Sequence, residues 1–272
     1  MKMSLIIAVY RRSDSLRLVM DSVCAQSYKD FEVIIAEDGK DSSILKVVEA
    51  FSCEHSIPIT HLTQEDKGFR KNRIFNKAIE AASGEMLIFI DGDCFLHRHF
   101  ISEYAKRSRD NLCLFGRRVM LDHVLTSKLL NGIKQVENLN AVSVFFSKSK
   151  KKEDAIYLPI RVTRRNRGIK GCSFCVPKKT MLRINGFDED FEEPFIGEDT
   201  DIERRLVLAG AALQCTKFNT IQYHLYHDSG DRTESFYKNL FLYSEKVKQE
   251  SFWCANGIIK ITDPSIMNDN MI

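Results

Sequence analysis

The sequence predicts an α/β fold in which a doubly wound, mainly parallel sheet carries helices on both faces. Short apolar runs at residues 5–9, 31–36 and 86–90 have the continuous hydrophobic pattern of strands that are buried on both sides. Segments with the apolar spacing of amphipathic helices separate these runs. Strands that alternate with helices in this way are typical of a parallel sheet.

The remaining elements follow the same rules. In the first half, we expect helices over residues 14–25 with Ser13 as the cap, from Ser42 or Ser43 onward and over residues 70–82, and a short strand over residues 58–62. In the less regular second half, we expect a strand and turn over residues 111–121 and helical character over 123–146. Charged loops are expected over 147–152 and 161–170. A strand over 171–176, a short helix opened by Pro177 and a helix over 197–210 should follow.

Length and composition narrow the class of protein. The 272 residues suffice for one large α/β domain or two small ones, and 44% hydrophobic with 28% charged residues is an ordinary globular balance. A net charge of +3 is too small to indicate nucleic acid as a partner. The chain has no apolar run of eighteen residues, and its apolar start precedes Arg11 and Arg12 rather than following them. We therefore expect a cytosolic protein with neither a membrane span nor a signal peptide.

Eight cysteines are spread along the chain, which does not resemble the dense disulfide framework of a small secreted protein. We expect reduced thiols. Cys172 and Cys175 form a C-x-x-C pair, but a structural zinc site needs a second pair of ligands, and no second pair has suitable spacing.

Polar clusters at residues 10–13, 37–41 and 91–93 each follow a predicted strand. Ligands of such sheets bind at the carboxyl ends of the strands, so these clusters should meet at one edge. Asp91 and Asp93, on a tight turn at Gly92, could hold a divalent cation that bridges a diphosphate. An Asp-Gly surface turn is the simpler alternative, but the buried strand before it favours a cation site.

Three further groups of residues could take part in binding or catalysis. Residues 67–73 place basic side chains at a helix start, which suits a phosphate, although a solvated helix end would look the same. Acidic residues at 198, 199 and 201 begin a helix, where they could complement its dipole or supply a general base. His224 or His227 could be a metal ligand or an ordinary packing residue.

Together these segments resemble glycosyltransferase family 2, whose members have the GT-A fold, a Rossmann-like architecture. The resemblance rests on SLIIAVY at residues 4–10, IIAEDG at 34–39, KGFR at 67–70 with NKAI at 76–79, residues 84–93, GFDE at 186–189 and GED at 197–199. The later part resembles the bacterial branch of chondroitin polymerases and of lipopolysaccharide or capsule glycosyltransferases. Where that family often has Gly-x-Asn-x-Ser, residues 171–175 read GCSFC.

The resemblance implies roles for individual residues. Asp199 would be the catalytic base, with Glu198 orienting the acceptor. Asp93 would bind the metal, Mn²⁺ or Mg²⁺, with His224 as a late ligand and His227 as its rival; Asp91 would contact ribose or metal. The nucleotide-sugar would be bound by Tyr10, Glu37, Asp38, Lys67, Arg70, Asn72, Asp91 and Gly92.

The implied reaction is a single inverting displacement from a nucleoside-diphosphate sugar, with a UDP-sugar as the expectation, to a glycan or lipid-linked acceptor in surface polysaccharide synthesis. Residues 1–110 would bind the nucleotide-sugar, residues 111–230 would form the acceptor-binding and catalytic half of the same domain, and residues 231–272 would be a helical extension. The basic stretch at 148–152, with Arg161, Arg164, Arg165 and Arg167, could contact an anionic membrane at its inner face, or form a solvated loop or a flap over the diphosphate.

Two rival functions remain. A nucleotidyltransferase also combines a doubly wound sheet with carboxylates and a metal, but it would normally have a glycine-rich loop after the first strand, and residues 10–13 contain no glycine. A catalytically inactive glycan-binding relative is expected to lose the Asp-x-Asp or the Gly-Glu-Asp segment, and both are present.

Overall fold

The computed structural model describes residues 1–160, 168–194, 197–228 and 233–261. Its main sheet has seven strands in the order β3-β2-β1-β4-β8-β6-β9. The strands are β1 (Met3–Val9), β2 (Phe31–Glu37), β3 (Ile59–Thr63), β4 (Met86–Asp91), β6 (Leu112–Phe115), β8 (Ser173–Pro177) and β9 (Ala212–Cys215). Neighbouring strands are parallel except where β8 pairs with β4 and β6. The predicted doubly wound, mainly parallel sheet is therefore confirmed.

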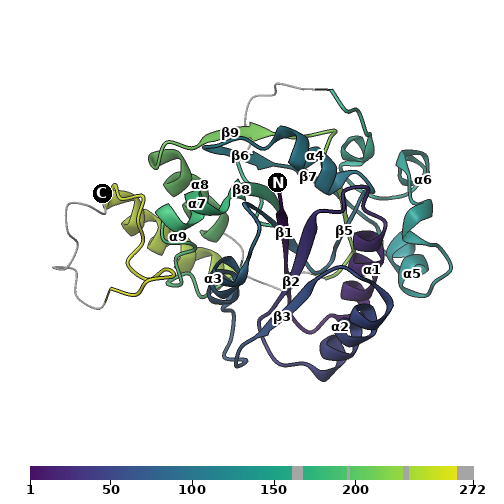
Figure 1. The fold of residues 1–272 in the computed structure, drawn as a ribbon, viewed down its shortest axis with the longest axis horizontal. Helices are drawn as coiled ribbons and strands as arrows, with labels where there is room; N and C mark the ends of the chain where they lie inside the picture. The colour runs from purple at the N-terminus through teal and green to yellow at the C-terminus, as the bar shows by residue number, and fades with distance from the viewer. Residues whose placement is uncertain (161–167, 195–196, 229–232, 262–272) are drawn as a thin grey trace.

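Helices cover both faces of this sheet (Figure 1). One core layer contains apolar side chains of α1 (Ser13–Cys24), α2 (Ser42–Glu54), α4 (Phe100–Arg107), α5 (His123–Leu130) and α6 (Ala141–Phe145). The opposite layer contains those of α3 (Lys71–Ala81), α7 (Lys178–Arg183) and α8 (Glu198–Leu208). The two layers draw on alternate residues of β1, since Leu5 and Ile7 face one and Ile6 the other. A final helix, α9 (Thr233–Lys248), follows the last strand.

A small second sheet brings a late part of the chain to the end of β4. It has the order β5-β10-β7, formed by β5 (Cys94–Leu96), β10 (Ile221–His224) and β7 (Arg117–Met120). Its register places His224 opposite Cys94, and Leu225 N donates a hydrogen bond to Asp93 O at 3.0 Å. This pairing joins residues that are about 130 positions apart in the sequence.

One detail of the expected helices is corrected. Ser13 does not cap α1: it is the first helical residue, and the preceding Arg12 makes no side-chain capping bond. The helical character expected over residues 123–146 takes the form of α5, a 3₁₀ turn (Val136–Asn138) and α6, with Gly132 at a left-handed φ of +70° after α5. The start of α2 at Ser42 agrees with the expectation, and Asp41 caps it by accepting a bond from Ser43 N at 2.8 Å.

The predicted division at residue 110 stays a prediction, although strands from both sides of that position share the main sheet. The part of the basic stretch at residues 161–167 lies outside the described residues. Within the described ranges, no helix is both long enough and apolar enough to span a bilayer.

Candidate active site

A cavity of about 790 Å³ opens at the carboxyl ends of β1, β2 and β4. The predicted site residues that line it are Tyr10, Asp38, Asp91, Gly92, Asp93, Glu198, Asp199, His224 and His227. The polar clusters after the three strands do meet, as their places in a parallel sheet predict. Parallel register explains this: Ala8 pairs with Ala36 on one side and with Asp91 on the other, so the three strands end together.

One group in this cavity has the donor set of a metal site. Asp93, His224 and His227 each offer a ligand atom, and the three atoms lie within 4.8 Å of one another. Asp93 Oδ2 is 3.5 Å from His224 Nε2 and 3.3 Å from His227 Nε2. Both histidines of the predicted rival pair therefore reach the same carboxylate, which the sequence alone did not indicate.

The protonation states of Asp93 and His224 suit metal binding, whereas the hydrogen bond to Asp93 raises the pKa of His227. Burial raises the pKa of Asp93, but the hydrogen bond with His227 and the charge of His224 outweigh it and hold that pKa at about 2. Burial lowers the pKa of His224, so its imidazole is neutral at neutral pH. An ionised carboxylate and a neutral imidazole are the forms that coordinate a cation. The residues present therefore fit the divalent cation that the fold implies.

The glycine between the two aspartates is required by close packing. Gly92 N donates to Ala8 O at 2.7 Å, and a Cβ at Gly92 would lie 2.9 Å from that oxygen. Any larger residue would push the Asp91–Asp93 turn away from the end of β1. The glycine thus holds the two carboxylates at the sheet edge.

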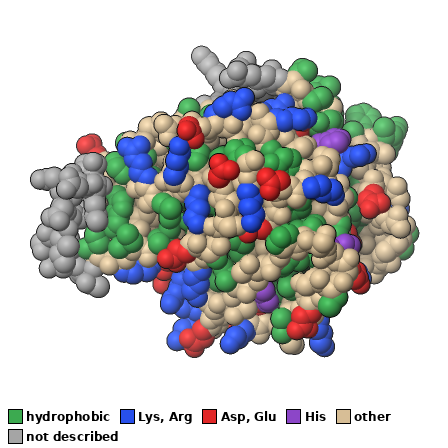
Figure 2. All heavy atoms as spheres, viewed as in Figure 1, with side chains coloured by type: hydrophobic (Ala, Val, Ile, Leu, Met, Phe, Trp, Pro, Cys, Tyr) green, Lys and Arg blue, Asp and Glu red, His purple; other side chains and the backbone are tan. Residues whose placement is uncertain are grey.

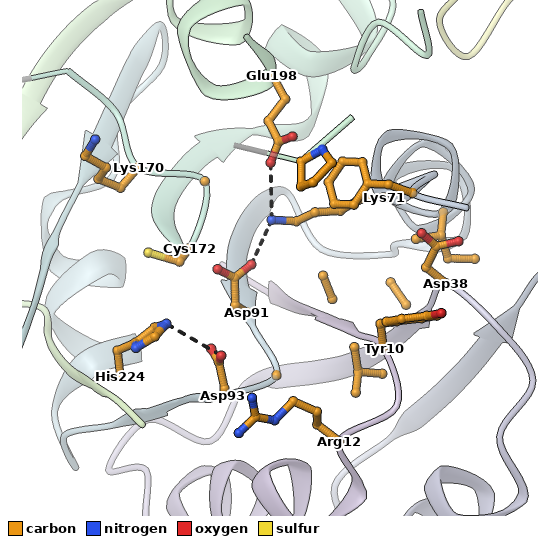
Figure 3. Close-up of a pocket in the computed structure, with 18 of the residues that line it drawn as sticks. Tyr10, Arg12, Asp38, Lys71, Asp91, Asp93, Lys170, Cys172, Glu198 and His224 are labelled. Atoms are coloured by element: carbon orange, nitrogen blue, oxygen red, sulfur yellow. Dashed lines mark hydrogen bonds and ion pairs between the residues drawn. The ribbon is translucent and has the colours of Figure 1, made fainter. Parts of the chain in front are cut away.

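Asp91 is oriented by a lysine rather than by the histidines. Lys71, the first residue of α3, places Nζ 2.8 Å from Asp91 Oδ1 and 3.6 Å from Glu198 Oε1 (Figure 3). Burial lowers the pKa of Lys71, but the charges of Asp91, Glu198 and Asp199 outweigh it and raise that pKa well above its usual value. The ammonium therefore stays charged and links the end of β4 to the start of α8.

Asp199 and Glu198 are half-buried carboxyl groups at the N-terminus of α8. Burial raises the pKa of Asp199, against the charge of Lys71 and a hydrogen bond from the Gly171 backbone. Burial also raises the pKa of Glu198 to about 7. A Cβ at Gly171 would collide with the Asp199 carboxylate, so the glycine permits that approach. Raised pKa values of this kind suit a general base at neutral pH.

Asp201, the third acidic residue in the first turn of α8, has a structural role. Asp201 Oδ2 accepts a hydrogen bond from Arg205 Nε at 2.6 Å, and both side chains are buried. Arg205 Nη1 also donates to Ile184 O and Gly186 O, each at 2.8 Å. Asp201 therefore supports the packing of α8, and only the first two acids face the cavity.

On the opposite side of the cavity, Asp38 follows β2 and lies near the exposed ring of Tyr10 (Figure 3). Its two carboxylate oxygens accept bonds from Gln64 Nε2 and from Arg70 N, each at 2.7 Å. These bonds hold the carboxylate in the loop that follows β2, at the edge of the cavity. There it can accept a hydrogen bond from a base or a ribose.

Four predicted nucleotide-sugar residues do not line the cavity in the described part of the chain. Glu37 is buried and bonded to His61 at 2.7 Å, and Asn72 donates to Asp188 O at 2.7 Å. Lys67 pairs with Glu65 at 2.8 Å on the surface, and the guanidinium of Arg70 donates to the Glu65 carbonyl. Their part in binding the donor remains an untested prediction.

Other cations that the sequence analysis did not single out do line it. Besides Lys71, these are Arg12, Arg118 and Lys170. Arg118 Nη1 is 3.8 Å from Asp91 Oδ2 and donates to Cys172 Sγ at 3.0 Å. Lys71 lies inside the basic stretch at 67–73, which the sequence analysis expected to bind a phosphate. The sequence did not indicate which residue of that stretch faces the cavity.

Comparison with known sequences agrees with this geometry. The sequence model of glycosyl transferase family 2 matches residues 4–189, well over half of the chain. The chain belongs to glycosyl transferase family 2. A second model, described as the N-terminal domain of galactosyltransferase, matches residues 156–228 of this glycosyltransferase.

Relatives of this glycosyltransferase include two bacterial chondroitin synthases. That of Escherichia coli is 25% identical over 245 residues, which cover 82% of this chain and 34% of the relative. That of Pasteurella multocida is 23% identical over 225 residues, which cover 76% and 23% respectively. The chain thus spans 34% and 23% of the length of these two relatives.

Solved structures show the same fold. The mannosyltransferase PcManGT from Pyrobaculum calidifontis, in complex with GDP-Man and Mn²⁺, superposes with a TM-score of 0.61 at 14% identity, covering 91% of this chain and 64% of that one. Residues 1–349 of TarS from S. aureus, in complex with UDP, superpose with a TM-score of 0.61 at 16% identity, covering 91% and 65%. The GT-A fold of this glycosyltransferase is therefore confirmed.

Proposed function

We propose that this chain is an inverting, metal-dependent glycosyltransferase that uses a nucleoside-diphosphate sugar. The observation that carries the proposal is the content of one cavity. The Asp93–His224–His227 group and the half-buried Asp199 carboxyl both line it, with four cationic side chains around them. A donor diphosphate and an acceptor hydroxyl could therefore be held together in one space.

Asp93, His224 and His227 would hold the cation, which when bound supplies positive charge that stabilises the departing nucleoside diphosphate. Lys71, Arg118 and their neighbours add fixed positive charge to the same end of the cavity. Because the set contains two imidazoles, it favours Mn²⁺ over Mg²⁺, which prefers oxygen ligands.

Asp199 would act as the base. Its carboxylate takes the proton of the acceptor hydroxyl as that oxygen forms a bond to the anomeric carbon and the bond from that carbon to the diphosphate oxygen breaks. Attack from the side opposite the leaving group inverts the anomeric centre. Glu198, held by Lys71 at 3.6 Å, lies beside the base and would orient the acceptor.

We propose a UDP-hexose or UDP-N-acetylhexosamine as the donor and a glycan or lipid-linked oligosaccharide of a surface polysaccharide, such as capsule or lipopolysaccharide, as the acceptor. The chondroitin synthase relatives and the UDP complex of TarS support this choice. The GDP-Man complex of PcManGT makes GDP-mannose the alternative donor to include in a test.

Product analysis with a panel of UDP-sugars, GDP-sugars and nucleoside triphosphates, in the presence of Mn²⁺, tests the proposal. We expect release of UDP, slow with water and faster with an acceptor glycan. Release of pyrophosphate from a nucleoside triphosphate would instead identify a nucleotidyltransferase. Donor binding without any turnover would identify an inactive glycan-binding relative, and either result would overturn the proposal.

We further propose peripheral contact with an anionic membrane through residues 123–152, on the cytoplasmic side. This segment holds six lysines and one acidic residue, a net charge of +5, whereas the whole chain carries +3, so the rest of the chain is net negative. It also exposes large apolar side chains: Ile133 is 74%, Val142 65%, Phe145 68% and Phe146 83% exposed.

The arrangement of these residues supports interfacial binding. Phe145 and Phe146 lie at the end of α6, and Lys152 Nζ is 5.9 Å from the Phe145 ring. Figure 2 shows hydrophobic side chains gathered at the end of the molecule where α6 lies in Figure 1. Apolar groups rimmed by lysines combine the two contributions that bind a protein to a lipid surface, burial in the acyl boundary and attraction to anionic headgroups.

A further inference from the structure

Two cysteine thiols meet beside the cavity, although they are 78 positions apart in the sequence. Cys94 begins β5 directly after Asp93, and Cys172 lies in the turn that leads into β8. Their sulfur atoms lie within 4.8 Å of each other, and the two thiols are hydrogen-bonded. Both cysteines are free in the structure.

The surroundings of this pair favour sulfur chemistry over cation binding. Asp91 also lies within reach of both sulfurs, but Lys71 at 2.8 Å and Arg118 at 3.8 Å already supply positive charge to its carboxylate. A cation placed there would be repelled by both. Arg118 Nη1 also donates to Cys172 Sγ at 3.0 Å, and a guanidinium so placed stabilises negative charge on the sulfur, the nucleophile in thiol oxidation.

Access differs between the two thiols. Cys172 lines the cavity, so a small oxidant that enters the donor site reaches it. Cys94 has no exposed surface and lies behind it. This is the arrangement of an attacked cysteine next to a resolving one.

We propose that Cys94 and Cys172 form a disulfide when the protein meets a peroxide, and that this bond switches off the donor site. Peroxide oxidises the Cys172 thiol to a sulfenic acid and leaves as one water. The Cys94 sulfur then attacks the sulfenic sulfur, the S–O bond breaks, and a second water leaves. The two electrons pass from the thiols to the peroxide, and a thiol reductant reverses the reaction.

The consequence for activity, which rests on the proposed function, follows from the neighbours of the two cysteines. A disulfide requires the sulfurs to approach to about 2.05 Å. Cys94 is bonded to Asp93, and Cys172 to Gly171, whose backbone donates a hydrogen bond to Asp199. Closing the bond therefore displaces a proposed metal ligand and the support of the proposed base together.

Peptide mapping of the full chain tests the bond itself. The reduced protein is treated with hydrogen peroxide, its remaining thiols are alkylated, and disulfide-linked peptides are identified by mass spectrometry. We expect a Cys94–Cys172 peptide whose mass is two hydrogens lower, lost again on treatment with dithiothreitol. A link from Cys172 to Cys175 instead, or no link when the exposed Cys53 is oxidised, would overturn the proposal.

Activity tests the consequence. Oxidation should lower transfer by about tenfold or more, the scale of losing the support of a metal or its ligands, and dithiothreitol should restore it. Cys94→Ser should remove the reversible loss, whereas Cys53→Ser, a matched change of an exposed cysteine on α2, should retain it. A linked protein with full activity would overturn the switch. If the reduced protein transfers no sugar, the proposed function fails, but mapping still decides whether the disulfide forms.

Discussion

Lys71 Nζ lies 2.8 Å from Asp91 Oδ1, so the first residue of α3 is joined to the last residue of β4. The same ammonium is 3.6 Å from Glu198 Oε1 at the start of α8. One cation thus connects the turn that carries the proposed metal ligand to the helix that carries the proposed base. This relationship leads to the first prediction.

Lys71→Met should leave Glu198 without its cation and Asp91 with only Arg118, at 3.8 Å. Breaking a fully buried pair costs about 3–5 kcal/mol, and with side chains 16% and 26% exposed we expect roughly 2 kcal/mol off the free energy of unfolding. Donor affinity should fall as well, because Asp91 loses its orientation. Urea denaturation and titration with UDP measure the two effects. Lys71→Arg keeps the charge and is the control; if Lys71→Met unfolds at the wild-type urea concentration, the ion pair does not contribute.

Asp199→Asn keeps the shape of the proposed base and removes its ability to accept a proton. Turnover should fall by about a hundredfold or more, with little change in donor affinity. Single-turnover transfer and UDP binding measure these quantities. Asp201→Asn is the matched control: it should lower stability through Arg205 and leave the turnover of the folded protein unchanged. An unaltered rate in Asp199→Asn would place the base elsewhere.

The metal group predicts Mn²⁺ dependence. Asp93→Ala should abolish the Mn²⁺-stimulated binding of UDP while the circular dichroism spectrum stays that of the wild type. His224→Ala and His227→Ala should each weaken Mn²⁺ binding by at least about tenfold, since losing even an outer-shell partner of a ligand costs about 10–100-fold. Isothermal titration calorimetry with Mn²⁺ measures the affinity of each variant for the metal and does not depend on sugar transfer. Full activity in EDTA would contradict the metal site altogether.

Glu198 predicts a pH dependence of stability in metal-free buffer. Its pKa is raised from 4.5 to about 7, chiefly by burial, so between these values the folded chain holds a proton that the unfolded chain has released. Stability should therefore fall as pH rises through this window. Relative to Glu198→Gln, the wild type should lose roughly 3 kcal/mol of unfolding free energy from pH 4.5 to 7. Parallel curves for the two proteins would show that the carboxyl titrates normally.

The segment at residues 123–152 predicts binding to vesicles that contain phosphatidylglycerol. Changing both Lys150 and Lys151 to serine should lower binding by roughly tenfold or more, at about 1 kcal/mol per charge. Changing both Phe145 and Phe146 to serine should lower it at all salt concentrations. The matched control changes Tyr237 and Phe241 on α9, which are 63% and 70% exposed, to serine. Co-sedimentation with vesicles at low salt measures binding. If the wild-type protein does not bind, the proposed membrane contact is wrong.

The sequence by itself determined the order of strands and helices from β1 to β4 and the edge at which the site forms. Hydrophobic periodicity is a local property, so the buried runs at β1, β2 and β4 could be identified without the fold. Once these strands are parallel, the polar residues that follow them must meet, which explains why Asp38, Asp91 and Asp93 were found.

Only the tertiary structure decided which side chains face the cavity. Of the basic stretch at 67–73, Lys71 points inward because α3 begins there, whereas Lys67 pairs with Glu65 on the surface. His224 and His227 reach Asp93 only because β10 pairs with β5. Cys172 reaches Cys94 because β5 is held in place by this pairing and because β8 lies beside β4. Such contacts depend on strand register and helix phase across long sequence separations, which local periodicity does not specify.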